Sequence, residues 1–373
     1  MKSIKELKSL TGKKVILRAD FNVPIKDGKV VDDFRIKKTI PTILYLQKKG
    51  ARVVIISHIG DKGTESLLPV ANTLKKLIKG FNFIETPIFS DETEKRINGM
   101  KNGEIVLLEN LRRDTGEKKN SPSFARALSR YGEIYINDAF SVSHRDHASV
   151  VGITKYLPGY AGFQLIEEVE NLSKVFSPSH PFLFILGGAK FDTKIPLVKK
   201  FLRSADNIFI GGAIANDFFK AKGYEVGVSL VGNTNFQIPQ LLKAKNLILP
   251  IDVEVTKNSK NRFVNPSDVS PDENIVDAGP KSVEMLKDLV NKASFILWNG
   301  PLGKYENGFG GATEELLKII SKSKAKSVIG GGDTTALISK LKIEDKLGFV
   351  STGGGATLDF LSKGTLTGIR VLK

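Results

Sequence analysis

The sequence predicts an α/β protein with two doubly wound parallel sheets. Its 373 residues exceed what one ordinary hydrophobic core organises, so two domains are expected. Short apolar runs rich in β-branched residues recur along the chain, and most are separated by stretches whose apolar residues have helical spacing. Because a helical crossover makes its two strands parallel, each half is expected to form a Rossmann-like sheet covered by helices.

The strands are expected at short apolar runs that are bounded by polar or glycine-rich turns. Four runs lie in the first half and six in the second: Val15–Leu17, Val53–Ile56, Ile105–Leu108 and Ile134–Ile136, then Phe182–Leu186, Ile208–Ile210, Leu247–Leu249, Phe295–Trp298, Val328–Ile329 and Phe349–Val350. After the first run, Ile36, Ile40, Ile43 and Leu44 have the spacing of one helical face.

A central helix and hinge are predicted between the halves. Residues 163–176 have apolar side chains at near-helical spacing, and the proline-rich stretch 177–181 ends the pattern. We therefore expect an N-terminal domain at 1–160, an interdomain helix and hinge at 161–181, and a C-terminal domain at 182–355. An ordinary crossover helix within one domain would give the same pattern.

The composition restricts the classes of function. The absence of cysteine excludes disulfides, thiolate metal sites and a thiol nucleophile. No apolar run approaches the ~20 residues that span a bilayer, and the first ten residues lack the apolar core of a signal peptide, so a soluble, unexported protein is expected. The net charge of +16 permits a nucleic-acid partner. Scattered lysines without interleaved aromatic residues favour a solvated surface over an RNA-binding protein, which stays the alternative.

Arginine and glycine are distributed unequally, which suggests two kinds of anion site. Nine of the twelve arginines precede residue 151, while 25 of the 35 glycines follow residue 150. Arginine grips a phosphate or carboxylate with a planar fork of donors, which suits a small, doubly anionic substrate. A glycine turn at a helix start exposes backbone N–H groups to a phosphate chain, which suits a nucleotide.

The polar turns that follow the predicted strands are candidate binding residues. In open parallel sheets these turns meet at one edge, where ligands bind. In the first half they contain Asp20, Asn22 and the basic candidates Arg18, Arg35, His58, Arg112, His144, Arg145 and His147. Any one of these arginines could instead form a structural ion pair, and a packed histidine is as good an interpretation of His144 and His147.

In the second half, lysines and glycine turns suggest phosphate binding. Lys190 and Lys194 follow Gly187-Gly188 and share one face if the stretch is helical. The turns Gly330-Gly-Gly-Asp-Thr334 and Thr352-Gly-Gly-Gly-Ala356 each lead from a strand into a helix, and the first offers a carboxylate for magnesium. Neither turn matches the Walker, protein-kinase or dinucleotide-binding patterns, so the common nucleotide folds are less favoured.

Taken together, these motifs resemble the phosphoglycerate kinase family from end to end. The matching stretches are Arg18–Pro24, Asp33–Ile36, Ser57–Gly60, Leu108–Arg112, Asn137–Phe140, His144–His147, Leu186–Lys190, Trp298–Pro301, Gly330–Thr334 and Ser351–Gly355. The resemblance implies a monomeric, cytoplasmic hinge enzyme of glycolysis and gluconeogenesis. It would transfer a phosphoryl group reversibly between 1,3-bisphosphoglycerate and ADP, giving 3-phosphoglycerate and ATP, with Mg²⁺ bound to the nucleotide and with no membrane or nucleic-acid partner. It also implies that residues 356–373 return to the N-terminal domain.

The resemblance assigns a role to individual positions. For substrate binding it implies Asp20, Phe21, Asn22, Arg35, His58, Gly60, Arg112 and Arg145. For nucleotide binding it implies Gly188, Lys194, Gly211, Asn299, Pro301, Glu306, Gly331, Gly332, Asp333 and Thr334, with Asp333 the metal ligand and Glu306 the ribose-binding acid. For catalysis it implies Arg35, Lys190, Gly353, Gly354 and Gly355.

One loop departs from the family pattern. Asp61 and Lys62 stand where an arginine and a proline are usual, and Arg113 stands where an aromatic residue is common. An aspartate beside a bound phosphate is repulsive unless it is turned away. Either Lys62 replaces the usual arginine or the triose site is weaker, and a kinase for another small carboxylic acid stays the alternative.

Overall fold

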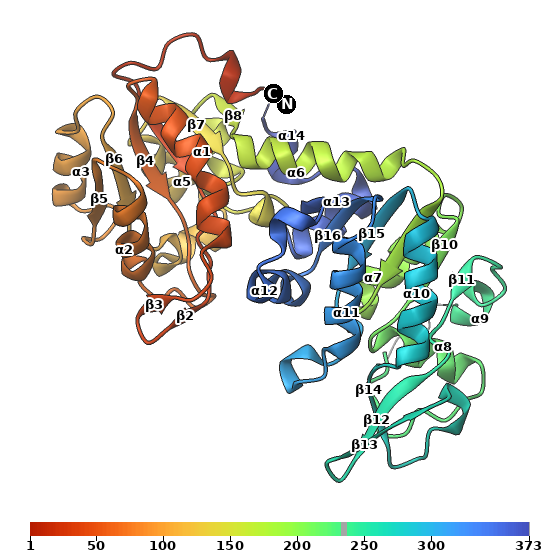
Figure 1. Cartoon of the computed structure of the whole chain (residues 1–373). Helices are drawn as coiled ribbons and strands as arrows, with labels where there is room; N and C mark the ends of the chain where they lie inside the picture. The colour runs from red at the N-terminus through yellow and green to blue at the C-terminus, as the bar shows by residue number, and fades with distance from the viewer. Residues whose placement is uncertain (233–236, 373) are drawn as a thin grey trace. The chain divides into compact units, whose positions relative to one another are not determined.

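The computed structural model describes residues 1–232 and 237–372 (Figure 1). Two compact units divide the chain: residues 1–170 with 365–372 form the first, and Asn171–Gly364 form the second. No helix in the described part of the chain is both long enough and apolar enough to cross a membrane.

The first unit is a parallel sheet with helices on its faces (Figure 1). Its strand order is β5-β6-β4-β1-β7-β8. The strands are β1 (Lys14–Arg18), β4 (Arg52–Ile56), β5 (Phe81–Ile84), β6 (Ile105–Leu108), β7 (Ile134–Asn137) and β8 (Gly159–Ala161), and the helices are α1 (Phe34–Lys48), α2 (Leu68–Leu77), α3 (Asp91–Asn98), α4 (Thr115–Lys118) and α5 (Pro122–Ser129). The side chains of β6 and β7 are buried throughout, as expected of strands covered on both faces.

The order of the first sheet places the predicted loops at one edge. Strand β1 lies between β4 and β7, and Arg18 pairs in register with Ile56 and Asn137, the last residues of those strands. All three strands are parallel, so the loops that follow them leave the sheet at the same edge. A small antiparallel hairpin of β2 (Ile25–Lys26) and β3 (Lys29–Val30) follows β1.

The second unit repeats this architecture around a second parallel sheet. Its order is β11-β10-β9-β15-β16-β17. The strands are β9 (Phe182–Leu186), β10 (Asn207–Ile210), β11 (Leu247–Ile248), β15 (Phe295–Asn299), β16 (Lys326–Gly330) and β17 (Phe349–Val350), and the helices are α7 (Phe191–Phe201), α8 (Ile214–Ala221), α9 (Ile238–Leu241), α10 (Pro280–Lys292), α11 (Gly311–Ser321), α12 (Gly332–Leu341) and α13 (Gly355–Lys363). The predicted fold class is therefore confirmed, and each of the ten apolar runs overlaps one strand of the two parallel sheets.

The periodicity did not predict a third sheet. Strands β12 (Val253–Lys257), β13 (Lys260–Val264) and β14 (Asn274–Ala278) form an antiparallel sheet of order β13-β12-β14 in the second unit. Strand β13 is exposed at nearly every position, so it lacks the apolar signal of a buried strand. In the first unit, β5 and β8 were also missed, because Asn82 interrupts one apolar run and Gly159 opens the other.

The middle of the chain forms a helix at the predicted place. Helix α6 covers Phe163–Ser173, and a 3-10 helix at Lys174–Phe176 continues it. The two compact units divide inside α6, after Glu170. The carboxylate of Asp138 accepts the backbone N–H of Gln164 at 2.9 Å, which satisfies one of the open donors of the first helical turn.

The carboxyl end is divided between the units. Helix α13 belongs to the second unit, whereas residues 365–372 belong to the first. Helix α14 (Thr367–Arg370) is attached there by the Gly368 N–H, which donates to the carbonyl of Ser143 at 2.8 Å.

Candidate active site

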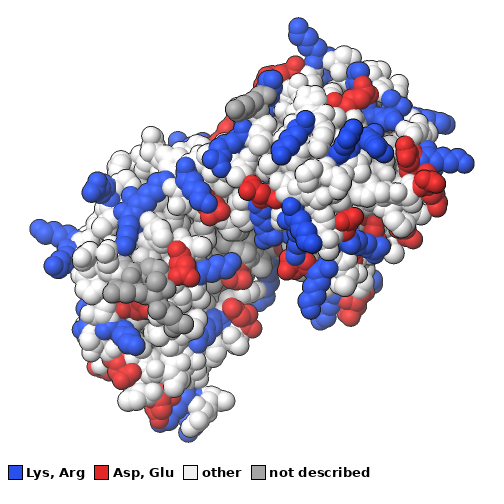
Figure 2. Space-filling view, turned by 180° about the vertical axis from the view of Figure 1, so that it is seen from behind, with Lys and Arg blue, Asp and Glu red and all other residues white. Residues whose placement is uncertain are grey.

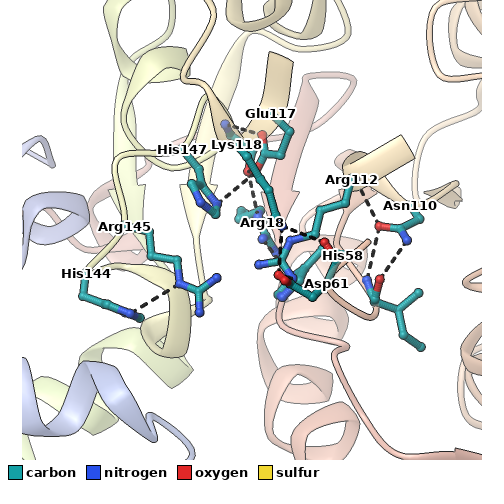
Figure 3. A network of polar contacts seen from close by, with 12 residues as sticks. Arg18, His58, Asp61, Asn110, Arg112, Glu117, Lys118, His144, Arg145 and His147 are labelled. Carbon is teal, nitrogen blue, oxygen red and sulfur yellow. Dashed lines mark hydrogen bonds and ion pairs between the residues drawn. The ribbon is translucent and has the colours of Figure 1, made fainter. Parts of the chain in front are cut away.

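The carboxyl edge of the first sheet carries a cluster of cations. We call Arg18, Arg112, Lys118 and Arg145 the basic cluster (Figure 3). Arg18 is the last residue of β1, Arg112 lies in the turn after β6, Lys118 ends α4, and Arg145 follows β7. Elements far apart in sequence thus bring like charges together, which is a stable arrangement only near anions.

Arg18 is fully buried and has the most complete set of partners in the cluster. Its Nε donates to Ser149 Oγ at 2.9 Å, and that hydroxyl donates to the buried carboxylate of Glu117 at 2.6 Å. Its Nη2 lies 3.1 Å from His58 Nδ1. Because arginine only donates, Nδ1 of His58 must accept and the ring proton resides on Nε2.

His58 is held neutral in this environment. Burial lowers its pKa well below the usual value, and the neighbouring charge of Arg18 lowers it further, although Asp20 acts in the opposite direction. His58 can therefore donate a hydrogen bond from Nε2 without bringing a charge. The pKa of His147 is lowered to about 4, first by burial and then by Arg18 and Arg112.

Asp20 and Arg35 form a pair beside the cluster. Arg35 Nη1 lies 2.7 Å from Asp20 Oδ2, and the hydroxyl of Ser141 donates to the same oxygen. Burial by itself would raise the pKa of Asp20, but Arg35 and the other partners lower it to about 2. The side chain of Asp20 is therefore an anion that orients Arg35 at the start of α1.

The two residues after Asp20 are already engaged within the chain. Phe21 is fully buried, and its backbone N–H donates to Ser57 Oγ at 3.0 Å. Asn22 accepts the N–H of Gly60 through Oδ1 at 3.0 Å. Phe21 thus contributes packing, and Asn22 fixes the loop that follows β4.

Asp61 is neutralised by residues other than its neighbour in sequence. Its Oδ1 lies 2.9 Å from Lys118 Nζ and 3.4 Å from Arg112 Nη1 (Figure 3). The pKa of Asp61 is lowered, chiefly by the hydrogen bond from Lys118. From the sequence, Lys62 was one candidate to compensate the charge of Asp61. Lys62 is exposed and makes no ion pair with any residue that the structure describes, so it does not neutralise Asp61.

Arg145 is the most open member of the cluster. Its side chain is exposed, and its Nε donates to His144 Nε2 at 3.4 Å (Figure 3). The pKa of Arg112 is lowered, chiefly by burial and next by the nearby charge of Arg145. The remaining guanidinium donors of Arg145 are available to a ligand.

The second unit contains a pocket of about 460 Å³ at the carboxyl edge of its sheet. Predicted residues that line it are Gly188, Lys190, Lys194, Asn299, Pro301, Glu306, Gly331, Gly332, Asp333 and Gly354. The other predicted residues of this unit lie next to the lining: Gly211, Thr334 and Gly353 are buried, and Gly355 is exposed at the start of α13. The volume suits a nucleotide-sized ligand.

Glycine is required where two turns of this pocket meet. Gly212 has φ +58°, and a Cβ there would lie 2.3 Å from the backbone N of Gly188 and 2.9 Å from the carbonyl O of Pro301. Real Cβ atoms do not approach backbone so closely. Only glycine therefore lets the turns after β9, β10 and β15 pack backbone to backbone.

The two lysines of the pocket differ in environment. Lys190 is exposed at the N-cap of α7, whereas Lys194 is buried and donates through Nζ to the carbonyl of Gly187 at 2.5 Å. Burial lowers the pKa of Lys194 to about 8, with a contribution from Lys190, while Asp333 acts to raise it. The exposed carboxylate of Asp333 lies in the first turn of α12.

Several residues at the two sites were not predicted. The pocket lining also includes residues that were not predicted, most of them apolar: Asn216, Phe219, Leu230, Pro250, Val253 and Ile275. Such side chains are typical of any core, so nothing in the sequence marks them as ligand contacts. Lys118 was also missed, because lysine is so frequent in this chain that a single one carries no signal.

Basic side chains are otherwise dispersed. On the face drawn in Figure 2 they are scattered and lie among acidic ones, which fits a solvated surface. The described residues contain no cluster of three or more His, Cys, Asp or Glu side chains that could hold a metal by themselves.

Comparisons with known proteins agree on one family. The family model described as phosphoglycerate kinase matches residues 4–364. The chain is 39% identical to phosphoglycerate kinase of Borrelia turicatae, covering 100% of both sequences, and 40% identical to that of Dictyoglomus turgidum, covering 98% and 96%. Among solved structures, phosphoglycerate kinase from Coxiella burnetii matches with a TM-score of 0.83 at 36% identity, covering 99% of this chain and 98% of that one. The enzyme from Pyrococcus horikoshii OT3 matches with 0.87 at 31%, covering 100% and 98%.

Proposed function

The chain belongs to the phosphoglycerate kinase family, and from that premise we propose which of its residues bind the two substrates and carry the transfer. It is a glycolytic kinase that moves a phosphoryl group between 1,3-bisphosphoglycerate and ADP, giving 3-phosphoglycerate and ATP. The convergence of Arg18, Arg112 and Arg145 at one sheet edge is the observation that carries the assignment of sites.

In this proposal the triose substrate binds at the carboxyl edge of the first sheet. Arg112 and Arg145 neutralise its phosphate, and His58 donates a hydrogen bond from Nε2. Asp20 and Asn22 lie where they can meet its hydroxyl and carboxyl region, and Gly60 sets the backbone of the adjoining loop. Support comes from the charge of this edge: Arg145 is exposed and keeps free guanidinium donors near the buried Arg112, so a small anion can be bound there.

The nucleotide is assigned to the pocket of the second unit. Gly331 and Gly332 offer backbone donors at the start of α12. Gly188 and Gly211 shape the neighbouring turns, since their own N–H groups donate to the carbonyls of Pro301 and Leu186. Asn299 and Pro301 also line the pocket, and its apolar lining residues receive the base. Glu306 is placed at the ribose, because a carboxylate can accept from its hydroxyls. Lys194 would hold a phosphate oxygen.

The residues present fit a nucleotide-bound Mg²⁺. The exposed carboxylate of Asp333 lines the pocket beside the start of α12, and the neighbouring hydroxyl of Thr334 is buried without a hydrogen-bond partner among the described residues. Mg²⁺ commonly takes one or two protein carboxylates and completes its shell with phosphate oxygens and water. When bound, the ion would neutralise charge on the nucleotide phosphates, and Asp333 would hold it.

The chemistry needs charge neutralisation more than proton transfer. When 3-phosphoglycerate attacks ATP, its nucleophile is a carboxylate with a pKa of about 3.5, which is ionised at neutral pH, so no general base is required. We assign the stabilisation of the moving phosphoryl group to Arg35, Lys190 and the backbone N–H groups of Gly353–Gly355. Because a donor and an acceptor held on separate units must meet, hinge closure is part of the proposal. Small-angle scattering with both ligands tests it, and an unchanged radius of gyration would argue against a large closure.

A coupled assay tests the assigned reaction and the role of Arg35. We expect MgATP-dependent turnover on 3-phosphoglycerate and far less on other small carboxylic acids. An Arg35→Ala variant should lose two to three decades in kcat, since one preorganised donor is worth about 3 to 4 kcal/mol of barrier. A folded Arg35→Ala enzyme with normal turnover would remove Arg35 from this role. We also propose that the enzyme acts as a cytoplasmic monomer, which light scattering and cell fractionation can check.

A further inference from the structure

The loop that carries Asp61 is fixed above the basic cluster. The amide of Asn110 donates to the carbonyls of Ile59 at 2.8 Å and of Glu65 at 2.9 Å, which ties both ends of the loop to the turn after β6. Gly63 has φ +81°, and a Cβ there would lie 2.0 Å from the carbonyl O of Arg112. The position of Asp61 is therefore set by backbone packing against the segment that contains Arg112.

Asp61 is bound at this place by two members of the cluster. Lys118 Nζ donates to Asp61 Oδ1 at 2.9 Å and to the carbonyl of Asp61 at 2.7 Å, and Arg112 Nη1 lies 3.4 Å from the same Oδ1 (Figure 3). The side chain of Arg112 is only 4% exposed, whereas that of Asp61 is 79% exposed. The carboxylate of Asp61 therefore lies between the nearly buried guanidinium of Arg112 and the solvent.

The charges around Arg112 explain why an anion is favoured there. Arg145 and Arg18 both disfavour the charged form of Arg112, and Asp61 favours it. Glu117 is connected to Arg18 through Ser149, so that carboxylate is engaged in the interior. Asp61 is the anion that contacts Arg112 and Lys118 directly at the solvent side.

We propose that Asp61 is an intrachain counterion that competes with the phosphate of the triose substrate for Arg112 and Lys118. Lys118 is then a phosphate-binding residue that becomes available when the substrate displaces the carboxylate. The inference rests on the proposed function for the identity of the substrate. Asp61 is then expected to raise the KM for 3-phosphoglycerate, because substrate binding must break the contacts of Asp61 with Arg112 and Lys118 and must bring the phosphate close to the carboxylate.

Three variants and a control test this competition. Asp61→Asn keeps the size of the side chain and removes its charge, and Lys118→Gln removes the positive charge that Asp61 neutralises. The double variant completes a double-mutant cycle, which measures the coupling between the two residues. Glu133→Gln is the matched control, because Glu133 forms an exposed ion pair with Lys13 at 2.7 Å and precedes β7, at the opposite edge of the same sheet. It changes net charge as much as Asp61→Asn does.

We expect Asp61→Asn to lower the KM for 3-phosphoglycerate roughly three- to tenfold, with kcat within about twofold of the parent. The KM for MgATP should not change, and Glu133→Gln should match the parent in every constant. In the Lys118→Gln background the gain from Asp61→Asn should shrink by about half or more, a coupling that a purely structural role does not produce. An unchanged or raised KM in Asp61→Asn would overturn the proposal.

Titration with inorganic sulfate separates this inference from the assigned reaction. Calorimetry needs no turnover, and we expect Asp61→Asn to bind sulfate several-fold more tightly than the parent and Glu133→Gln to bind it equally. Tighter sulfate binding by Asp61→Asn without turnover on 3-phosphoglycerate would refute the proposed function and would support the role of Asp61 as a counterion. Equal sulfate binding by all variants, with normal turnover, would leave the function standing and refute the counterion.

Discussion

A methyl group at Gly212 should damage the nucleotide pocket. Alanine at φ +58° costs about 1 to 2 kcal/mol in backbone strain alone. Its Cβ would lie 2.3 Å from the N of Gly188, so the turns must separate, which adds about 1 to 3 kcal/mol. We therefore expect Gly212→Ala to lower the free energy of unfolding of the second unit by about 2 to 5 kcal/mol.

A second glycine separates the strain from the clash. Gly223 has φ +84°, and a Cβ there would meet nothing within 4 Å. Gly223→Ala should therefore lower the free energy of unfolding only by the backbone strain, about 1 to 2 kcal/mol. Trp298 is the single tryptophan and is fully buried in β15, so its fluorescence during urea unfolding reports on the second unit.

Kinetics complete this test. Gly212→Ala should raise the KM for MgATP at least about tenfold, since a shift of about 1 Å in positioning groups is costly, and should leave the KM for 3-phosphoglycerate unchanged. Gly223→Ala should leave both unchanged. Equal unfolding free energies and equal nucleotide KM values for the two variants would refute the close packing of the three turns.

Three further predictions concern ionisable groups. Since the pKa of Lys194 is lowered to about 8, kcat/KM for MgATP should fall above that pH as the ammonium loses its proton, and a pH profile flat to about 9.5 would contradict this. The pKa of Asp20 is lowered to about 2, so Asp20 contributes stability that is present above its ordinary pKa of 3.8 and is lost as the pH falls through 2. Arg35→Ala should remove a substantial part of this stability at pH 7, since Arg35 is the first of the partners that lower the pKa. Equal denaturation curves for the two proteins at pH 7 would argue against a stabilising Asp20–Arg35 pair. Burial raises the pKa of Asp138 to about 7, so stability should decline from pH 4 to 7 as the unfolded carboxyl ionises first; Asp138→Asn should flatten that slope in thermal melts, and an unaltered slope would exclude Asp138 as its source.

The buried parallel sheets were predictable because their strands carry a strong, local signal. In β9 and β15 every residue is buried, and the sequence shows it as the apolar runs Phe182–Leu186 and Phe295–Trp298. The β12–β14 sheet gave a weaker signal, because β13 is exposed at nearly every position, β12 is only partly buried, and Asp277 interrupts the apolar run of β14.

How far the sequence could point to candidate site residues depended on how specific each residue type is. Glycine doublets and triplets and the twelve arginines stand out in this sequence, and Asp333 and Arg112 were singled out as candidates in this way. The partner of Asp61 was not predictable, because Lys118 lies 57 residues away and only the fold brings its Nζ to that carboxylate. Sequence proximity suggested Lys62 instead, although neighbouring side chains in a tight loop often point apart.

The most direct test of the division of substrates between the units is hydrogen exchange with each ligand alone. We predict that 3-phosphoglycerate slows exchange in residues 57–61 and 110–113 of the first unit, and that MgADP slows it in residues 187–191, 211–213 and 331–334 of the second. Protection of the second-unit turns by 3-phosphoglycerate, or of the basic cluster by MgADP, would contradict the assignment of the triose site to the arginines and of the nucleotide site to the glycine turns.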